Sequence, residues 1–215
     1  VNISSAADTF FNDQEPSEEP SALFNKLGIT KPFVLYTGGA DPRKNLTRLL
    51  EAYAQIPAEL RLQHQLVLAG RIDRAEHLAL LKGIKASGMN ADEVVFTEYI
   101  SDDELQTLYY SCKLFVFPSW HEGFGLPVLE AMSCGCPVIA SNSTAIPEII
   151  EYNDFLFDPN DFISLYEMIK IVLKSEEIQS KLNVKISSFP TIFIKINKKY
   201  YKYEGKREIK NILQF

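Results

Sequence analysis

The sequence lacks a long apolar run, a secretory leader and a cysteine framework. It contains no run of about 18 apolar residues, which a membrane-spanning helix would need. No charged segment followed by an apolar one opens it, so we expect no secretory leader. Its three cysteines are odd in number, and the Cys134-Gly-Cys136 spacing fits neither a zinc site nor a redox pair. We therefore expect free thiols in a reducing cytosol.

Basic residues are scarce over most of the chain and gather at its end. Residues 1–25 hold five acidic side chains and neither Lys nor Arg. Residues 186–215 carry seven basic and two acidic side chains, a net of +5, so the total of −6 leaves −11 on residues 1–185. A body this acidic binds nucleic acid poorly through bulk electrostatics, and we expect no nucleic-acid partner.

Short apolar runs alternate with helical patterns through the middle of the chain. The predicted strands are Phe33–Thr37, Gln65–Ala69, Val94–Phe96, Leu114–Phe117, Pro137–Ala140 and Phe155–Phe157. The predicted helices begin at Asp41-Pro42, at a segment with Leu78, Leu81 and Ile84 on one face, at the capping box Ser101–Glu104, at Leu126, and near Asp161. This alternation predicts an α/β fold with a doubly wound, parallel, Rossmann-like sheet that helices cover on both faces.

Ligands of such sheets bind outside the carboxyl ends of the strands. The segment Phe117–Met132 reads as a strand, a glycine-containing loop and a helix start closed by Gly135. Free backbone N–H groups and the positive end of the helix dipole make this an anion site. Glu122 on the loop and Glu130 in the helix would be surface carboxylates if taken alone. Their placement favours a polyol hydroxyl for Glu122 and a ribose diol for Glu130.

Arg43 and Lys44 follow Gly38-Gly39 at another predicted helix start. One interpretation is a solvated helix end, where cations oppose the dipole and are slightly unfavourable. The other is a bound diphosphate, which the fork of Arg43 and the point charge of Lys44 would suit, and this is the interpretation we favour.

Several motifs occur together, in one order. They are Gly38–Leu50 (GGADPRKNLTRLL), Leu66–Arg71, Tyr99–Leu105, Phe117–Glu130 with its Glu-x7-Glu spacing, Cys136–Ser141 and Ile146–Glu148. This set resembles the retaining nucleotide-sugar glycosyltransferases of family four, which have the GT-B fold. The chain resembles their C-terminal, donor-binding domain, and among these enzymes it resembles the mannosyltransferases. The resemblance covers about residues 30 to 160.

The resemblance implies a role for each matching position. Arg43, Lys44 and Glu122 would be the catalytic residues: the two cations would bind the donor diphosphate and Glu122 the hydroxyls of the transferred sugar. The other implied donor-binding residues are Gly38, Gly39, Arg71, Tyr99, Ile100, Gly123, Phe124, Gly125, Leu126, Val128 and Glu130. Arg71 would reach phosphate, Tyr99 and Ile100 would border the base, and Glu130 would bind ribose. The family often has Arg where this chain has Gly39, so Arg43 is the candidate substitute. No metal and no cofactor are expected.

The resemblance also implies a function. We expect transfer of a hexosyl unit, with retention, from a nucleotide-diphosphate sugar to a glycan or lipid-linked acceptor, with GDP-mannose favoured. Such enzymes bind the acceptor mainly on an N-terminal domain, and residues 1–8 resemble the linker that follows it. We therefore expect little activity from this chain alone; the alternative is a non-catalytic nucleotide-sugar binding module or truncated remnant. A cytoplasmic location, peripheral at the inner membrane face, would suit such an enzyme.

The domain boundaries expected are a linker-like segment at 1–29, the nucleotide-sugar domain at 30–180 and a basic, atypical tail at 181–215. Three interpretations of the tail compete: a hairpin-like appendage, a basic contact for membrane or RNA, and a segment not evolved for this fold. Partial disorder or a poorly packed appendage is the expectation.

Overall fold

The structure is a computed structural model, and it describes residues 10–11, 16, 19–150, 153–182, 192–196 and 199–203. The strands are β1 Phe33–Thr37, β2 Gln65–Ala69, β3 Val94–Glu98, β4 Leu114–Phe117, β5 Val138–Ser141, β6 Leu156–Phe157, β7 Ile192–Ile196 and β8 Lys199–Tyr203. The α-helices are α1 Pro20–Leu27, α2 Leu46–Ala54, α3 Ala58–Arg61, α4 Arg74–Ala86, α5 Asp102–Ser111, α6 Leu126–Ser133, α7 Ile146–Ile149 and α8 Phe162–Leu182. Three 3-10 turns, η1 Pro42–Lys44, η2 Ala91–Glu93 and η3 Asn153–Phe155, complete them.

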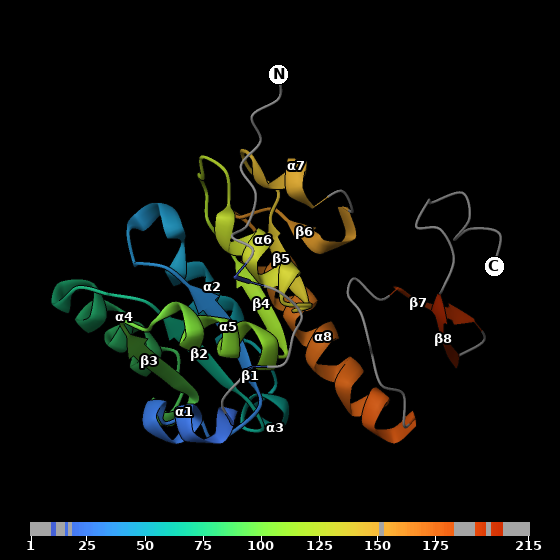
Figure 1. Ribbon diagram of the computed structural model, residues 1–215, viewed down its shortest axis with the longest axis horizontal. Coiled ribbons are helices and arrows are strands. Elements are labelled where there is room, and N and C mark those ends of the chain that lie inside the picture. Colours follow the sequence, from blue (N-terminus) through green and yellow to red (C-terminus); the bar gives the residue numbers. More distant parts are fainter. Residues whose placement is uncertain are drawn as a thin grey trace.

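Six strands form one parallel sheet in the order β3-β2-β1-β4-β5-β6. Helices lie on both sides of it (Figure 1). The predicted doubly wound, Rossmann-like α/β fold is thereby confirmed. Chain order reverses between β1 and β4, which pair directly, Val34 with Leu114 and Leu35 with Phe115. This reversal is the topological switch point, where ligands of such sheets bind.

Two apolar cores, one on each face, hold the sheet. Val34 and Tyr36 of β1 pack on the side of α2, α4 and α8, whereas Phe33 and Leu35 pack on the side of α1, α5 and α6. Every residue of β1, β2 and β4 is buried. Strands buried on both faces have continuous apolar runs rather than alternation. The predicted bounds of these three strands are confirmed for that reason.

The helix after β1 begins later than predicted. Asp41 and Pro42 open the 3-10 turn η1, in which the Asp41 carboxylate accepts the Arg43 N–H at 3.0 Å. Asn45 then adopts a left-handed conformation (φ 59°), and α2 starts only at Leu46. The capping aspartate was identified correctly, but the helix it was expected to cap is interrupted by this one residue.

The apolar face expected for α4 was right at Ile84 and wrong at Leu78 and Leu81. Leu78 and Leu81 are 51% and 39% exposed, and Leu80 and Ile84 are the buried residues of this helix. Apolar side chains at 78, 80, 81 and 84 allow two different faces, and the spacing of four between Leu80 and Ile84 meets the core. The capping box at Ser101–Glu104 is confirmed.

The predicted tail lies largely outside the described residues. Within it, α8 extends to Leu182, and β7 and β8 pair antiparallel, Ile192 with Tyr203 through Ile196 with Lys199. A hairpin of this kind was one of the three interpretations.

Candidate donor-binding site

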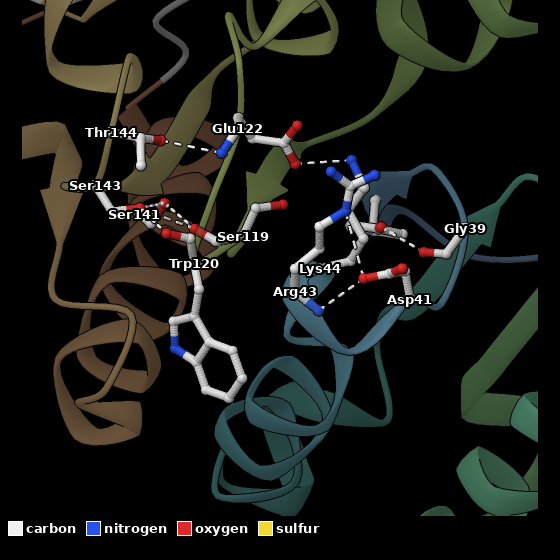
Figure 2. A network of polar contacts seen from close by, with 11 residues as sticks. Gly39, Asp41, Arg43, Lys44, Ser119, Trp120, Glu122, Ser141, Ser143 and Thr144 are labelled. Carbon is white, nitrogen blue, oxygen red and sulfur yellow. Dashed lines mark hydrogen bonds and ion pairs between the residues drawn. The ribbon is translucent and has the colours of Figure 1, made fainter.

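The loops that follow β1 and β4 meet in an ion pair. Lys44 Nζ lies 2.7 Å from Glu122 Oε1, and the two side chains are only 17% and 12% exposed. Figure 2 shows this pair between the two loops. The Lys44 ammonium also stands 5.7 Å from the centre of the Phe117 ring, a cation–π contact. The structure thus brings together a cation and a carboxylate from motifs 78 residues apart.

Arg43 is held to the same place mainly through its backbone. Its carbonyl oxygen accepts the Trp120 N–H at 2.8 Å, which ties the two loops together. Its side chain is 58% exposed, with Nε 3.4 Å from the Asp41 carboxylate, itself 56% exposed. An ion pair this exposed adds little stability. The guanidinium can therefore turn toward an anion at modest cost.

Gly38 and Gly39 belong to a corner where the β1 and β2 loops touch. A Cβ on Gly70 would lie 2.5 Å from the Gly38 carbonyl oxygen. Gly70 and Gly38 both have left-handed φ values, 130° and 132°. Only glycine allows so close a backbone approach. Among the described residues, a Cβ on Gly39 would meet only the Arg71 carbonyl oxygen, at 3.7 Å, so a side chain fits there. The Arg71 side chain itself is exposed.

Tyr36 secures the Gly39 peptide from inside the sheet. Its hydroxyl donates to the Gly39 carbonyl oxygen at 2.7 Å. Burial, and to a smaller extent the charge of Glu122 and Asp41, raises the pKa of Tyr36 far above its usual value. The hydroxyl consequently stays protonated and continues to donate.

Hydroxyl groups after β5 hold the loop that carries Glu122. Ser141 Oγ donates to the Ser119 carbonyl oxygen, and the single hydrogen of Ser143 Oγ lies between the Trp120 and Ser119 carbonyl oxygens, at 2.9 and 3.1 Å. The Glu122 N–H donates to Thr144 Oγ1 at 3.0 Å. Figure 2 shows Ser141, Ser143 and Thr144 on the opposite side of this loop from Lys44. The position of these three residues after a strand end places their loop at the site, but sequence reasoning assigned no role to the side chains.

Asn45 is a further supporting residue, to which sequence reasoning assigned no role. It is 3% exposed, and its amide donates to the Pro118 and Pro159 carbonyl oxygens at 3.0 and 2.9 Å. One side chain therefore anchors the loops after β1, β4 and β6 to each other.

The start of α6 supplies fewer amides than an average helix. Gly125 precedes it with φ 93°, and the Val128 N–H already donates to the Gly125 carbonyl oxygen at 3.0 Å. Pro127 has no N–H, so the Leu126 amide is better placed than the Val128 amide to donate to an anion. Gly123 is exposed, Phe124 is half-buried and Gly125 is buried.

Glu130 and the predicted base-contacting residues come from α6 and from the segment after β3. Glu130, within α6, accepts a hydrogen bond from the buried Tyr109 hydroxyl at 3.2 Å, a partner that sequence reasoning missed. Tyr99, 82% exposed, and Ile100, half-buried, follow β3. Because β3 is separated from β1 by β2, roughly 10 Å lies between their ends. This distance suits one extended ligand rather than a single cluster.

Among the described residues, no group of three or more His, Cys, Asp or Glu side chains is placed to hold a metal ion. None of the helices within the same part of the chain is long and apolar enough to cross a membrane.

Comparisons with known proteins point to one family. Residues 21–187 match the family described as Glycosyl transferases group 1. The serotype-specific mannosyltransferase WbdA of Escherichia coli is 37% identical over 183 residues, which is 85% of this chain but 22% of that protein. The chain thus spans about a fifth of the length of this relative.

Solved structures agree in fold. Anabaena HepE in complex with UDP and glucose is 25% identical, with a TM-score of 0.67 over 78% of this chain and 45% of that one. The C-terminal domain of the group 1 family protein LpcC from Francisella tularensis is 22% identical, with a TM-score of 0.67 over 83% of this chain and 92% of that one.

Proposed function

The chain belongs to the group 1 glycosyl transferases, and from this membership we propose that its β1–β4 edge binds the nucleotide-sugar donor of a hexosyl transfer. This membership confirms the resemblance to the family-four glycosyltransferases. The sheet and its flanking helices have the fold of the C-terminal half of a GT-B enzyme. The single observation that carries the proposal is the Lys44–Glu122 pair at the switch point.

Each member of that pair suits a different part of the donor. Lys44, together with the turned guanidinium of Arg43, would bind the diphosphate, aided by the Leu126 amide. Glu122 would then accept hydrogen bonds from hydroxyls of the sugar. The β3 end with Tyr99 lies about two strand spacings away, which is where a base extending from the phosphates would reach.

The proposed chemistry needs positive charge at the leaving group. The bond between sugar C1 and the diphosphate oxygen breaks, the acceptor oxygen bonds to C1 on the same face, and the acceptor proton passes to the leaving diphosphate. Lys44 and Arg43 would stabilise the charge that develops there. Loss of one such contact costs ~3 kcal/mol of barrier, on the order of a hundredfold in rate. Since side chains supply this charge, we propose that donor binding is unchanged by EDTA.

The donor proposed is GDP-mannose, since the name of the relative WbdA states mannosyl transfer. A UDP-sugar is the second candidate, since HepE was solved with UDP and glucose. Titration calorimetry of the 215-residue chain with GDP, UDP, GDP-mannose and UDP-glucose distinguishes the two. We expect GDP-mannose to bind most tightly. Folded protein that binds none of the four would overturn the proposal.

Transfer by the whole protein is a separate proposal. WbdA is several times longer than the segment matched here, so we propose that acceptor binding requires residues outside this chain. The 215-residue chain alone should then bind donor but transfer little. A mass-spectrometric assay with mannose-containing glycans tests this, and rapid transfer by the chain alone would contradict it. A chain that binds donor, yet never transfers when a relative's N-terminal domain is supplied, would favour the binding-module alternative.

A further inference from the structure

Tyr109 of α5 delivers a buried hydroxyl to the carboxyl edge of the sheet. Its side chain is fully buried, and its ring makes edge contacts with Phe115 and Phe11, at 5.3 and 5.9 Å between ring centres. A ring held between two others cannot swing, so the position of its hydroxyl is fixed. That hydroxyl lies 3.0 Å from Thr37 Oγ1 and 3.2 Å from Glu130 Oε2.

The direction of these two hydrogen bonds follows from their chemistry. An ionised carboxylate can only accept, so the Tyr109 hydroxyl donates its single hydrogen to Glu130. The Thr37 hydroxyl must then donate to Tyr109. Burial, and then the negative charge of Glu130, raises the pKa of Tyr109 well above its usual value, so the phenol remains a donor at neutral pH. The result is a one-way chain from the last residue of β1, through α5, to α6.

We propose that Tyr109 is a positioning residue, which holds the Glu130 carboxylate in the orientation that binds the ribose hydroxyls of the donor. This inference rests on the proposed function, in which Glu130 is the ribose ligand. A glutamate side chain on a helix has several rotamers, and ordering it at the moment of binding costs affinity. The Tyr109 hydroxyl is a hydrogen-bond donor fixed in the core and directed at one oxygen of the Glu130 carboxylate, so part of that ordering cost is removed before the ligand binds.

The test compares ligands with and without the ribose hydroxyls. Calorimetry of the 215-residue chain would use whichever of GDP or UDP it binds, and the 2′,3′-dideoxy analogue of that nucleotide. Wild type should prefer the ribonucleotide. Tyr109→Phe keeps the ring and removes only the hydroxyl. It should reduce this preference about three- to tenfold, mainly by lowering the affinity for the ribonucleotide.

Two further variants sharpen the result. Tyr53→Phe is the matched control: Tyr53 is equally buried, on the other face, and its hydroxyl has no hydrogen-bond partner among the described residues. Its preference should equal that of wild type. Thr37→Val removes the hydroxyl that donates to Tyr109 and leaves the Tyr109 ring intact. It should reduce the preference for the ribonucleotide, as Tyr109→Phe does, but by a smaller factor.

Each outcome decides a different point. Equal weakening of both ligands by Tyr109→Phe and Thr37→Val, with a lower unfolding temperature, would make the role merely structural and overturn the inference. A wild type that prefers the ribonucleotide, with the same preference in both variants, overturns the inference and leaves the proposed donor site standing. A wild type that binds both ligands equally removes the ribose role of Glu130, and the inference with it.

Discussion

Replacement of Glu122 by Gln should have different effects on a nucleoside diphosphate and on the nucleotide sugar. In the ligand-free chain, Glu122 competes with any incoming phosphate for the ammonium of Lys44, 2.7 Å away. A hydrogen bond to a charged group contributes about 1.5–3 kcal/mol. Both side chains retain some exposure, 12% and 17%, so the lower value is the appropriate one. Glu122→Gln should therefore tighten GDP binding about tenfold.

The sugar changes the balance. In the complex with GDP-mannose, Glu122 would accept hydrogen bonds from sugar hydroxyls, and a charged acceptor binds about twice as strongly as a neutral one. The variant loses there roughly what it gains at the phosphate, so its dissociation constant for GDP-mannose should change by less than about threefold. The extra affinity that mannose gives over GDP alone should largely disappear.

Calorimetry with both ligands measures the two dissociation constants. Glu51→Gln is the control, because it removes the same charge from an exposed pair with Arg48 on α2, where the carboxylate is 45% exposed. It should leave both affinities unchanged. If Glu122→Gln weakens the binding of GDP, or leaves its dissociation constant unchanged, then the substitution does not release Lys44 and Glu122 does not compete with phosphate.

Three further predictions concern stability. Gly125 has φ 93°, and Gly125→Ala would place a Cβ 2.5 Å from Ile146 of α7. The variant should lower the free energy of unfolding by roughly 1–3 kcal/mol in thermal melts and weaken donor binding in calorimetry. Wild-type values for both would show that the loop relaxes freely. Arg61→Met leaves the fully buried Glu93 without its ion-pair partner and should cost about 3–5 kcal/mol in urea unfolding, whereas a cost below 1 would contradict this burial. The hydrogen bond from Lys26 lowers the pKa of Glu104, so the stability that this pair confers is present above the unfolded pKa of Glu104 and is lost as pH falls through the lower, folded pKa. Lys26→Met should therefore reduce the pH dependence of the urea midpoint between pH 6 and 3, and an unchanged pH profile would refute the prediction.

The sequence predicts well what depends on local pattern. β1, β2 and β4 are buried on both faces, and their carboxyl ends are marked by Gly38, Gly70 and Pro118. Where one residue decides, the pattern fails. Nothing in the periodicity shows that Asn45 takes a left-handed conformation and delays α2. Nor does it choose between the two faces open to α4.

The site divides in the same way. Parallel strands bring their following loops to one edge, so the Gly38–Lys44 and Ser119–Gly125 loops could be assigned from strand ends alone. The contact between Lys44 and Glu122 could not, because it depends on β4 lying beside β1 rather than beside β3. The contact of Tyr109 with Glu130 could not be predicted for a related reason: the Tyr109 ring belongs to the core, and only its hydroxyl reaches Glu130.

The amide of Asn45 has a consequence for anyone who wishes to redesign donor choice by grafting loops between relatives. Both of its hydrogens are used, one by the carbonyl of Pro118 and one by that of Pro159. A graft that replaces the loop after β4 alone must present a carbonyl at the same point, or the amide is left with an unsatisfied buried N–H. The loops after β1, β4 and β6 are therefore one transplantable unit, and a chimera should exchange all three or none.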